Sequence, residues 1–269
     1  MNSKMTTEVA IRRIGDETRA GSQDVVAIEE PLEIRIDCKP IVVTMRTPGC
    51  DPELAAGFLW TEGIIRRVDE VDSIQHCSSS ETDNVVTVRL AKGVKLDPSK
   101  LQRNFYATSS CGICGKATLD AIHQLVEPID EMIPLDAQVI HSLPDRMRQV
   151  QATFDTTGGS HAAGLFDMDG SLRCLREDVG RHNAVDKVIG WAVLGRSMPL
   201  TNTILGVSGR ASFEIVQKAA MARIPVLAAV SAPSSLAIEA ARRFHQTLIG
   251  FCRDSRFNVY HDPGRLVTE

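Results

Sequence analysis

The stretch TILGVSGRASFEIVQKAAMARIPVLAAVSA, residues 203–232, decides the fold class of this chain. It opens with a short apolar run, continues with apolar residues at helical spacing over 211–223, and closes with a second apolar run over 224–232. A helical pattern at 234–246 and a strand-like run at 247–253 follow. This strand–helix–strand–helix–strand order predicts an α/β fold, with a parallel sheet, right-handed crossovers and flanking helices.

The sequence on either side extends this unit. It predicts two helices, a β-hairpin and a last strand, at 146–154, 183–195, 161–178 and 256–262. The hairpin signal is the Asp169-Gly170 pair between two apolar runs, and Gly195 ends the second helix.

The first half of the chain indicates a smaller α+β unit. Its expected elements are a hairpin, a helix, two strands and a second helix, at 31–48, 51–65, 71–79, 84–91 and 116–127. Asp51 is the expected N-cap of the first helix, with Pro52 at its first position. The proline-rich stretch 128–145 marks a boundary near residue 135. We therefore expect a loose arm or edge strand, an α+β domain carrying the Cys-x-x-Cys loop, and an α/β cofactor-binding domain, over 1–30, 31–134 and 135–269.

The composition is that of an ordinary globular protein. The chain has 269 residues, 43% hydrophobic and 24% charged, with a formal net charge of −4. No basic excess points to nucleic acid, and neither a signal-peptide pattern nor an apolar run of membrane-span length occurs. Its seven cysteines are scattered, unlike a secreted disulfide framework. We expect a soluble, cytoplasmic protein with no nucleic-acid or membrane partner.

Three loops follow the carboxyl ends of the expected strands, where open α/β sheets bind ligands. They are Ser208-Gly209-Arg210, Ser231 to Ser235, and FCRDSR, which comprises Phe251, Cys252, Arg253, Asp254, Ser255 and Arg256. Helix N-termini, serine hydroxyls and arginine guanidinium groups all suit phosphate oxygens. The alternative is purely structural, because serine is a common N-cap and glycine a common turn residue. Neither glycine-rich nucleotide motif occurs here, so spacing alone leaves both open.

Two polar clusters precede these loops. The segment TTGGSHAAG places His161 after two glycines, which allow close approach of another group. The segment REDVGRHNAVDK, residues 176–187, places Arg181 and His182 at a helix start, where they can face a cleft. For Asp186 and Lys187 we expect a solvated helix face. A lone histidine is more often structural than catalytic, so the two histidines are candidates for lining a site.

The segment SSCGICGK, residues 109–116, contains the one Cys-x-x-Cys pair of the sequence. A structural zinc site needs four ligands, and the sequence has no second such pair and no HxE element of a zinc deaminase. A thiol–disulfide couple suits the motif, although the large sheet that follows does not. A sulfur carrier needs a reachable thiolate, which a helix N-terminus and Lys116 favour at Cys114, on a loop freed by Gly112 and Gly115. Spacing alone leaves these interpretations open.

Five motifs in one order resemble the FdhD family of formate dehydrogenase accessory sulfurtransferases. They are TSSCGICGK, GGSHAAG, REDVGRHNAVDK, VSGRASFEIVQKAA and IGFCRDSRFNVY. The resemblance covers the chain from about residue 30 to its end. It implies a cytidine deaminase-like, three-layer C-terminal domain without zinc chemistry, no permanently bound metal, and a homodimer.

The resemblance also implies an activity. Members take persulfide sulfur from a cysteine desulfurase and transfer it to the molybdenum, or tungsten, bis(molybdopterin guanine dinucleotide) cofactor that formate dehydrogenase requires. By family pattern Cys111 carries the persulfide, Cys114 assists, and Phe251 to Arg256 bind the cofactor. We add further candidate cofactor contacts: Ser208, Gly209, Arg210, His161 and His182.

Two functions of other classes remain as alternatives at this stage. One is a dithiol–disulfide oxidoreductase that cycles both thiols; the other is a non-enzymatic cofactor chaperone. The sequence decides neither between molybdenum and tungsten, nor which desulfurase is the donor, nor whether the two thiols act in turn.

Overall fold

The computed structural model describes residues 5–14, 22–37, 39–77, 83–94, 126–253 and 256–267. Its strands are β1 (Thr6–Ile11), β2 (Ser22–Ala27), β3 (Glu30–Ile36), β4 (Lys39–Arg46), β5 (Val71–His76), β6 (Val85–Leu90), β7 (Leu135–Asp136), β8 (His161–Asp167), β9 (Leu172–Asp178), β10 (Thr203–Val207), β11 (Val226–Ala229), β12 (Thr247–Arg253), β13 (Arg256–His261) and β14 (Leu266–Val267). Its α-helices are α1 (Asp51–Thr61), α4 (Ala137–Arg148), α5 (Ala152–Thr157), α6 (Arg181–Leu194), α7 (Phe213–Met221) and α8 (Ser235–Arg243).

The larger sheet has the strand order β13-β12-β11-β10-β8-β9. Strands β10, β11 and β12 are parallel, which confirms the unit predicted from residues 203–253. Strands β8, β9 and β13 are antiparallel to their neighbours, in the hairpin predicted at 161–178 and a second hairpin after β12. The sheet is therefore mixed, because hairpins extend its parallel centre on both edges.

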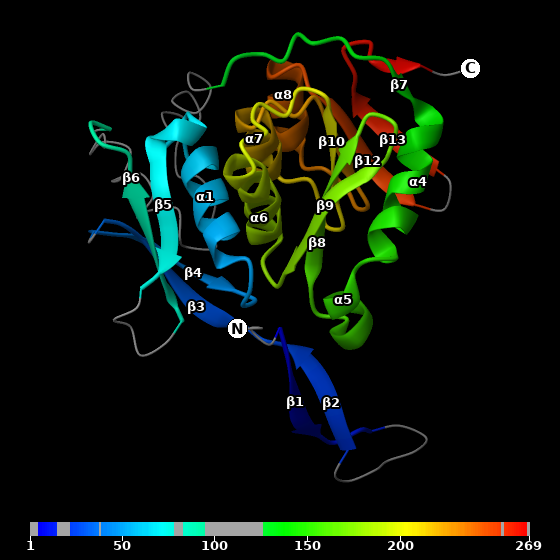
Figure 1. Ribbon diagram of the computed structural model, residues 1–269. Helices are drawn as coiled ribbons and strands as arrows, with labels where there is room; N and C mark the ends of the chain where they lie inside the picture. Colours follow the sequence, from blue (N-terminus) through cyan, green and yellow to red (C-terminus); the bar gives the residue numbers. More distant parts are fainter. Residues whose placement is uncertain are drawn as a thin grey trace.

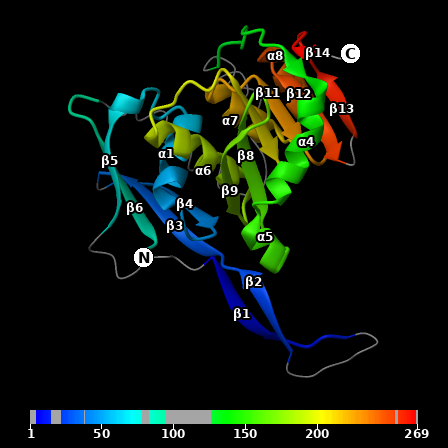
Figure 2. The same cartoon turned by 45° about the vertical axis from the view of Figure 1, so that its right-hand side comes forward.

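Helices cover both faces of this sheet (Figures 1 and 2). Helices α6, α7 and α8 cover one face and α4 covers the other. Leu205 and Leu227 face the α6–α8 side, whereas Ile204 and Val226 face α4. Burial on both faces explains the continuous apolar runs of these strands. Residues 135–267 thus form three layers, and their likeness to cytidine deaminases stays a prediction.

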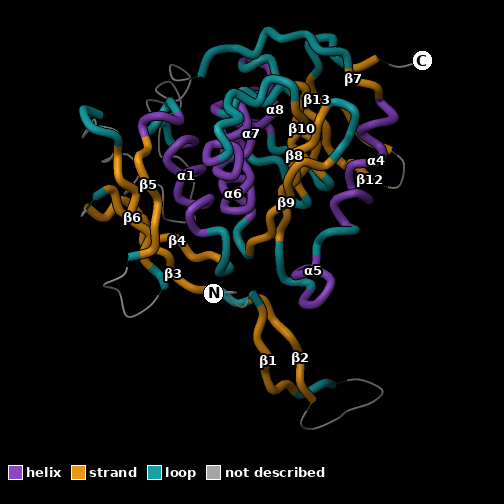
Figure 3. Tube along the Cα trace, viewed as in Figure 1, coloured by secondary structure: helices purple, strands orange, loops and turns teal. Residues whose placement is uncertain are grey.

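A smaller sheet, β4-β3-β6-β5, packs on the same unit through α1. Figure 3 shows α1, α6 and α7 as a helical layer between the two sheets. Gly57 of α1 and Gly190 of α6 lie where these helices cross, and a Cβ on Gly190 would be 1.7 Å from the carbonyl oxygen of Glu53. One hydrophobic cluster runs from Ile34 of β3 to Leu205 of β10, so the two predicted units share a core.

The start of α1 differs from the prediction. Its N-cap is Cys50, which has a left-handed backbone with φ 57° and makes no side-chain cap. Asp51 lies inside the helix, and its carboxylate accepts from the Arg46 guanidinium at 3.0 and 2.9 Å. The expected cap is wrong because this buried ion pair takes the carboxylate.

Residues 137–148 form α4, whereas the sequence predicted no helix over 137–145. The Asp136 side chain caps this helix by accepting from the Gln138 N–H at 2.8 Å, and Pro144 lies within it. The helix predicted over 146–154 is divided between α4 and α5, with a break at 149–151.

The N-terminal arm contains an antiparallel hairpin, β1–β2, that extends away from the body in Figures 1 and 2. Its base contacts α5, where the Thr153 hydroxyl lies 3.8 Å from the Met5 sulfur. Of the described strands, β1 and β2 pair with each other alone.

Candidate functional site

The carboxyl ends of the three parallel strands are held together by their backbones. The Ser231 N–H donates to the Gly209 carbonyl at 3.3 Å, and the Phe251 N–H donates to the Ser231 carbonyl at 3.2 Å. All three predicted loops therefore meet at one sheet edge. The described residues of the third loop are the paired ends of two antiparallel strands, β12 and β13, and not the start of a helix.

His161 is brought to the first of these loops by strand pairing. The Ala162 N–H donates to the Ser208 hydroxyl at 2.9 Å, and the Ser208 N–H donates to the Ala162 carbonyl at 3.0 Å. A Cβ on Gly209 would lie 3.4 Å from His161 Nδ1. Burial, aided by the charge of Arg181, lowers the pKa of His161, so the ring is neutral at neutral pH.

His182, in the first turn of α6, lies against the start of α7. Its Nε2 is 3.3 Å from the Ser212 hydroxyl and 3.9 Å from the Glu214 carboxylate. Burial, with the charges of Lys218 and Arg181, lowers the pKa of His182 to about 4. The structure thus places a second neutral imidazole at the same edge.

One buried polar atom without a hydrogen-bond partner in the described part of the chain and two helix N-termini lie at this edge. The buried Nε of Arg181 has no hydrogen-bond partner among the described residues. Neither Gly180 nor Ser212, the N-caps of α6 and α7, makes a side-chain cap, whereas Ser234 caps α8 by accepting from the Ala237 N–H at 3.2 Å. The N-termini of two helices, a guanidinium and neutral imidazoles together suit an anionic ligand such as a phosphate.

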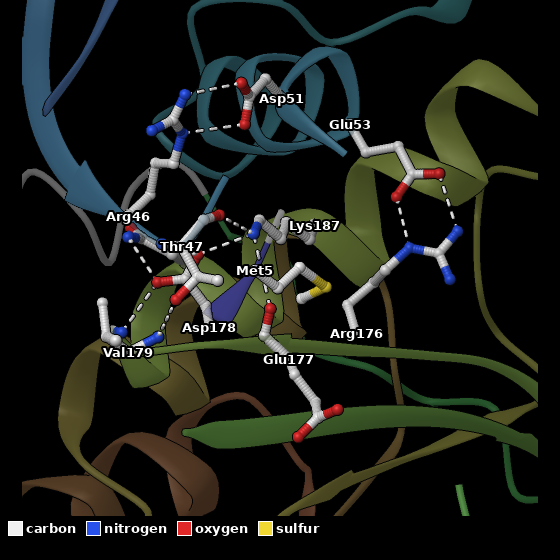
Figure 4. Close-up of polar contacts among 12 residues, drawn as sticks. Met5, Arg46, Thr47, Asp51, Glu53, Arg176, Glu177, Asp178, Val179 and Lys187 are labelled. Carbon is white, nitrogen blue, oxygen red and sulfur yellow. Dashed lines mark hydrogen bonds and ion pairs between the residues drawn. The ribbon is translucent and has the colours of Figure 1, made fainter. Parts of the chain in front are cut away.

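Asp186 and Lys187, at the end of REDVGRHNAVDK, lie in the protein interior, and Figure 4 shows Lys187 directed toward Asp178 and Thr47. Lys187 is 1% exposed, and its Nζ lies 2.7 Å from Asp178 and 2.8 Å from the Thr47 carbonyl. Asp186 is 2% exposed and pairs with Lys218 at 2.9 Å. The expected solvated face is wrong, because α1 and β4 cover this side of α6.

The FCRDSR segment divides between the sheet edge and the core. Phe251 is half-buried with a left-handed φ of 52°, and Arg253 and Arg256 are exposed and paired across the hairpin. The Cys252 thiol is buried and donates to the Ile140 carbonyl of α4 at 3.2 Å. The prediction that Cys252 contacts a ligand needs correction. Its thiol faces the core, so only its backbone could contact a ligand at the sheet edge. Asp254 and Ser255 lie outside the described residues, and Arg210 of the first loop is exposed.

The sulfur-carrying cysteines predicted from the sequence, Cys111 and Cys114, lie in residues 95–125, outside the described part. Within the described ranges, no cluster of three or more His, Cys, Asp or Glu side chains is able to hold a metal ion. None of the described helices is long and apolar enough to cross a membrane.

Sequence reasoning missed Glu214, which lies 3.9 Å from His182, and Lys218, which pairs with Asp186. Glu214 and Lys218 are four residues apart on α7, and His182 and Asp186 are four residues apart on α6. Paired i, i+4 polar positions on consecutive helices were the available signal.

These features define an α/β protein with a candidate anion site at the carboxyl ends of parallel strands. The chain belongs to the FdhD/NarQ family, whose model matches residues 27–267. A Streptomyces avermitilis protein named sulfur carrier protein FdhD is 51% identical over 98% of this chain and 96% of its own length, and one of the same name from Streptomyces coelicolor is 49% identical over 98% and 96%. A crystal structure assigned to a formate dehydrogenase accessory protein of Desulfotalea psychrophila matches with a TM-score of 0.78 and 27% identity, over 98% of this chain and 100% of that one.

Proposed function

We propose that this protein is a sulfurtransferase in formate dehydrogenase maturation. It accepts persulfide sulfur from a cysteine desulfurase and transfers it to the molybdenum, or tungsten, bis(molybdopterin guanine dinucleotide) cofactor. The observation that carries the proposal is full-length similarity, at 51% identity, to a protein named as a sulfur carrier. The structural match to a formate dehydrogenase accessory protein supports the acceptor.

The described cysteines favour the Cys-x-x-Cys pair as the sulfur-bearing site. A thiolate, not a thiol, attacks sulfur. Burial raises the pKa of Cys174 to about 12 and that of Cys252 to about 11. Burial, with the Glu53 carboxylate, also raises the pKa of Cys50. These three remain protonated at neutral pH, which leaves Cys38, Cys77, Cys111 and Cys114. Among these four, the Cys-x-x-Cys motif favours Cys111 and Cys114 as the carrier pair.

Loading follows ordinary thiol exchange. The Cys111 thiolate attacks the outer sulfur of the desulfurase persulfide, its S–S bond breaks, and the desulfurase cysteine leaves as a thiolate. A persulfide on Cys111 results. Attack by the Cys114 thiolate on the inner sulfur then releases hydrosulfide and forms a Cys111–Cys114 disulfide, so the two thiols are oxidised while the transferred sulfur is reduced. A dithiol reductant restores the pair.

The acceptor has two nucleotide diphosphate ends, and the residues at the sheet edge fit such groups. The Arg181 Nε, which has no partner among the described residues, is a donor for phosphate oxygens, and the N-termini of α6 and α7 attract negative charge. The exposed Arg253 and Arg256, at the paired ends of β12 and β13, are further positive charges that suit phosphate.

Reconstitution of formate dehydrogenase tests the proposal. Wild type and Cys174→Ala, loaded by a cysteine desulfurase, are expected to activate sulfur-free formate dehydrogenase, and Cys111→Ala is expected to lose activation. Full activation by Cys111→Ala would indicate a cofactor chaperone, and catalytic turnover in insulin reduction without activation would indicate a dithiol oxidoreductase. Either result overturns the proposal.

A further inference from the structure

Strand β9 ends in two consecutive carboxylates, and each binds a residue next to the candidate site. The Glu177 carboxylate accepts from the Ser160 hydroxyl at 2.7 Å, and Ser160 directly precedes His161. The Asp178 carboxylate accepts from the N–H of Gly180, the N-cap of α6, at 2.8 Å. Strand alternation directs the two side chains to opposite faces of β9, so they hold different elements at the same sheet edge.

The Glu177 carboxylate is held by hydrogen bonds and not by a cation. It is 7% exposed and forms no ion pair with a described residue, whereas Asp178 pairs with Lys187 at 2.7 Å. Besides the serine hydroxyl, the N–H groups of Thr153 and Phe154, in the first turn of α5, donate to it at 2.9 and 2.8 Å. A buried carboxylate is tolerated when donors surround it in this way.

Capping α5 alone does not require a carboxylate from β9. A serine, threonine, aspartate or asparagine at the N-cap would accept from such N–H groups locally, but the N-cap is Gln151, which makes no side-chain cap. Glu177 instead binds both the first turn of α5 and Ser160, which lies just beyond the end of that helix. It therefore joins the two ends of α5 at one point beside β8.

Ser160 fixes the chain directly before His161. The connection from α5 to β8 consists of Gly158, Gly159 and Ser160, and Gly158 has a left-handed φ of 65°. Because the glycines have no side chains, the Ser160 hydroxyl is the side-chain anchor of this connection. His161 is the first residue of β8, and a Cβ on Gly209 would lie 3.4 Å from its Nδ1. A small shift of this strand end therefore changes how the imidazole meets the first of the three loops.

We propose that Glu177 is a positioning residue of the candidate site, which fixes His161 against the first loop by holding the Ser160 hydroxyl. An imidazole that binds an anion must present its N–H at hydrogen-bond distance and in one direction. A buried carboxylate that is itself fixed by backbone N–H groups is a rigid support for that direction. The consequence for ligand binding rests on the proposed function, whereas the effect on the position of His161 does not.

Pyrophosphate binding to the full-length protein, measured by titration calorimetry, tests whether Ser160 acts through His161. Ser160→Ala leaves both α5 N–H bonds to Glu177 in place and is expected to lower the affinity about threefold. His161→Asn is expected to lower it about fivefold, the value of one hydrogen bond, and Ser160→Ala in that background is expected to add nothing. The matched control is Thr156→Ala, which removes an exposed α5 hydroxyl bonded to the Ala152 carbonyl at 2.9 Å and is expected to bind like wild type.

An equal loss of affinity from Ser160→Ala in both backgrounds, or no loss in either, would overturn the proposal. The NMR signals of the His161 ring, assigned with His161→Asn, are the second measurement and need no ligand. Ser160→Ala and Glu177→Gln are expected to shift these signals, and Thr156→Ala to leave them unchanged; unchanged signals in Ser160→Ala would overturn the proposal. If pyrophosphate does not bind the wild type, the proposed phosphate contacts fail, and the NMR comparison alone decides the role of Glu177.

Discussion

One short segment, residues 176–187, contains two kinds of charged side chain. Asp178, Asp186 and Lys187 are buried, and each is paired at 2.9 Å or less. Arg181 and His182, between them in sequence, are half-buried, and the Arg181 Nε has no partner among the described residues. Position along α6 divides them: Arg181 and His182 lie in its first turn at the sheet edge, whereas Asp186 and Lys187 lie one turn further on, where α1 covers them.

This difference in burial and pairing separates residues that stabilise the fold from residues that can contact a ligand. A buried ion pair that is broken leaves a costly unpaired charge, so the paired half resists change. An unsatisfied group at a cleft costs stability in the free protein and gains a partner when a ligand arrives. Substitutions in the paired half are therefore expected to affect folding, and substitutions in the other half to affect ligands.

The largest expected effect is that of Lys187→Met. It leaves Asp178 charged and buried, and it removes the donor of the Thr47 carbonyl. We expect a loss of about 3–5 kcal/mol in the free energy of unfolding, measured by urea denaturation.

Arg35→Met is the control, because its partner Glu33 lies on a partly exposed strand face. The expected change is within about 1 kcal/mol. Equal effects of the two substitutions would remove the distinction between the paired interior and the surface.

Gly190→Ala tests the helix crossing that buries the paired half. The added Cβ would lie 1.7 Å from the Glu53 carbonyl oxygen, so α1 and α6 must separate. We expect a loss of about 1–3 kcal/mol in the free energy of unfolding. Gly159→Ala, whose Cβ would find its nearest neighbour at 3.6 Å, is the control and is expected to be near neutral. A neutral Gly190→Ala would contradict the close backbone contact.

His182→Asn tests the other half. We expect nearly wild-type stability at neutral pH and pyrophosphate binding weakened about fivefold, the value of one hydrogen bond. Titration calorimetry measures the binding. His245→Asn, an exposed histidine 2.8 Å from Asp130, is expected to bind like wild type. Wild-type affinity in His182→Asn would remove His182 from the site.

A second expected effect of His182 is on the pH dependence of stability. The pKa of His182 is about 4 in the folded protein against 6.5 in the unfolded chain, so the unfolded chain binds more protons between these values. Stability therefore falls as pH drops through this window. His182→Asn is expected to lose less stability than wild type on acidification to about pH 5, in paired urea titrations. Parallel losses would contradict a neutral buried ring.

Much of the fold was predictable from local pattern. The apolar runs of β10, β11 and β12, and the turn at Asp169-Gly170, report burial and backbone geometry directly. The first nine residues of α4 were not, because Pro144 lies within the helix and its sequence does not continue a helical pattern, whereas the Asp136 cap starts the helix at residue 137. The Asp51 carboxylate likewise does not cap α1 as expected, because it accepts from the Arg46 guanidinium, a contact that no local pattern predicts.

The site was predictable in part. His161, His182 and the Ser208–Ser212 loop were named from the sequence, and the structure brings them together. Cys252 was named from its neighbours in FCRDSR, but strand alternation turns its thiol to the core. Asp186 and Lys187 were taken for surface charges, because no sequence pattern shows that α1 and β4 cover them.

The most direct test of the account is the location of the sulfur atom. The intact full-length chain is incubated with a cysteine desulfurase and cysteine, and its mass is measured under non-reducing conditions. Wild type and the Cys50→Ala/Cys174→Ala/Cys252→Ala variant are expected to gain the mass of one sulfur atom, and Cys111→Ala to gain none. A stable sulfur adduct on Cys111→Ala, or its loss from the triple variant, would contradict the assignment of the carrier to the Cys-x-x-Cys pair.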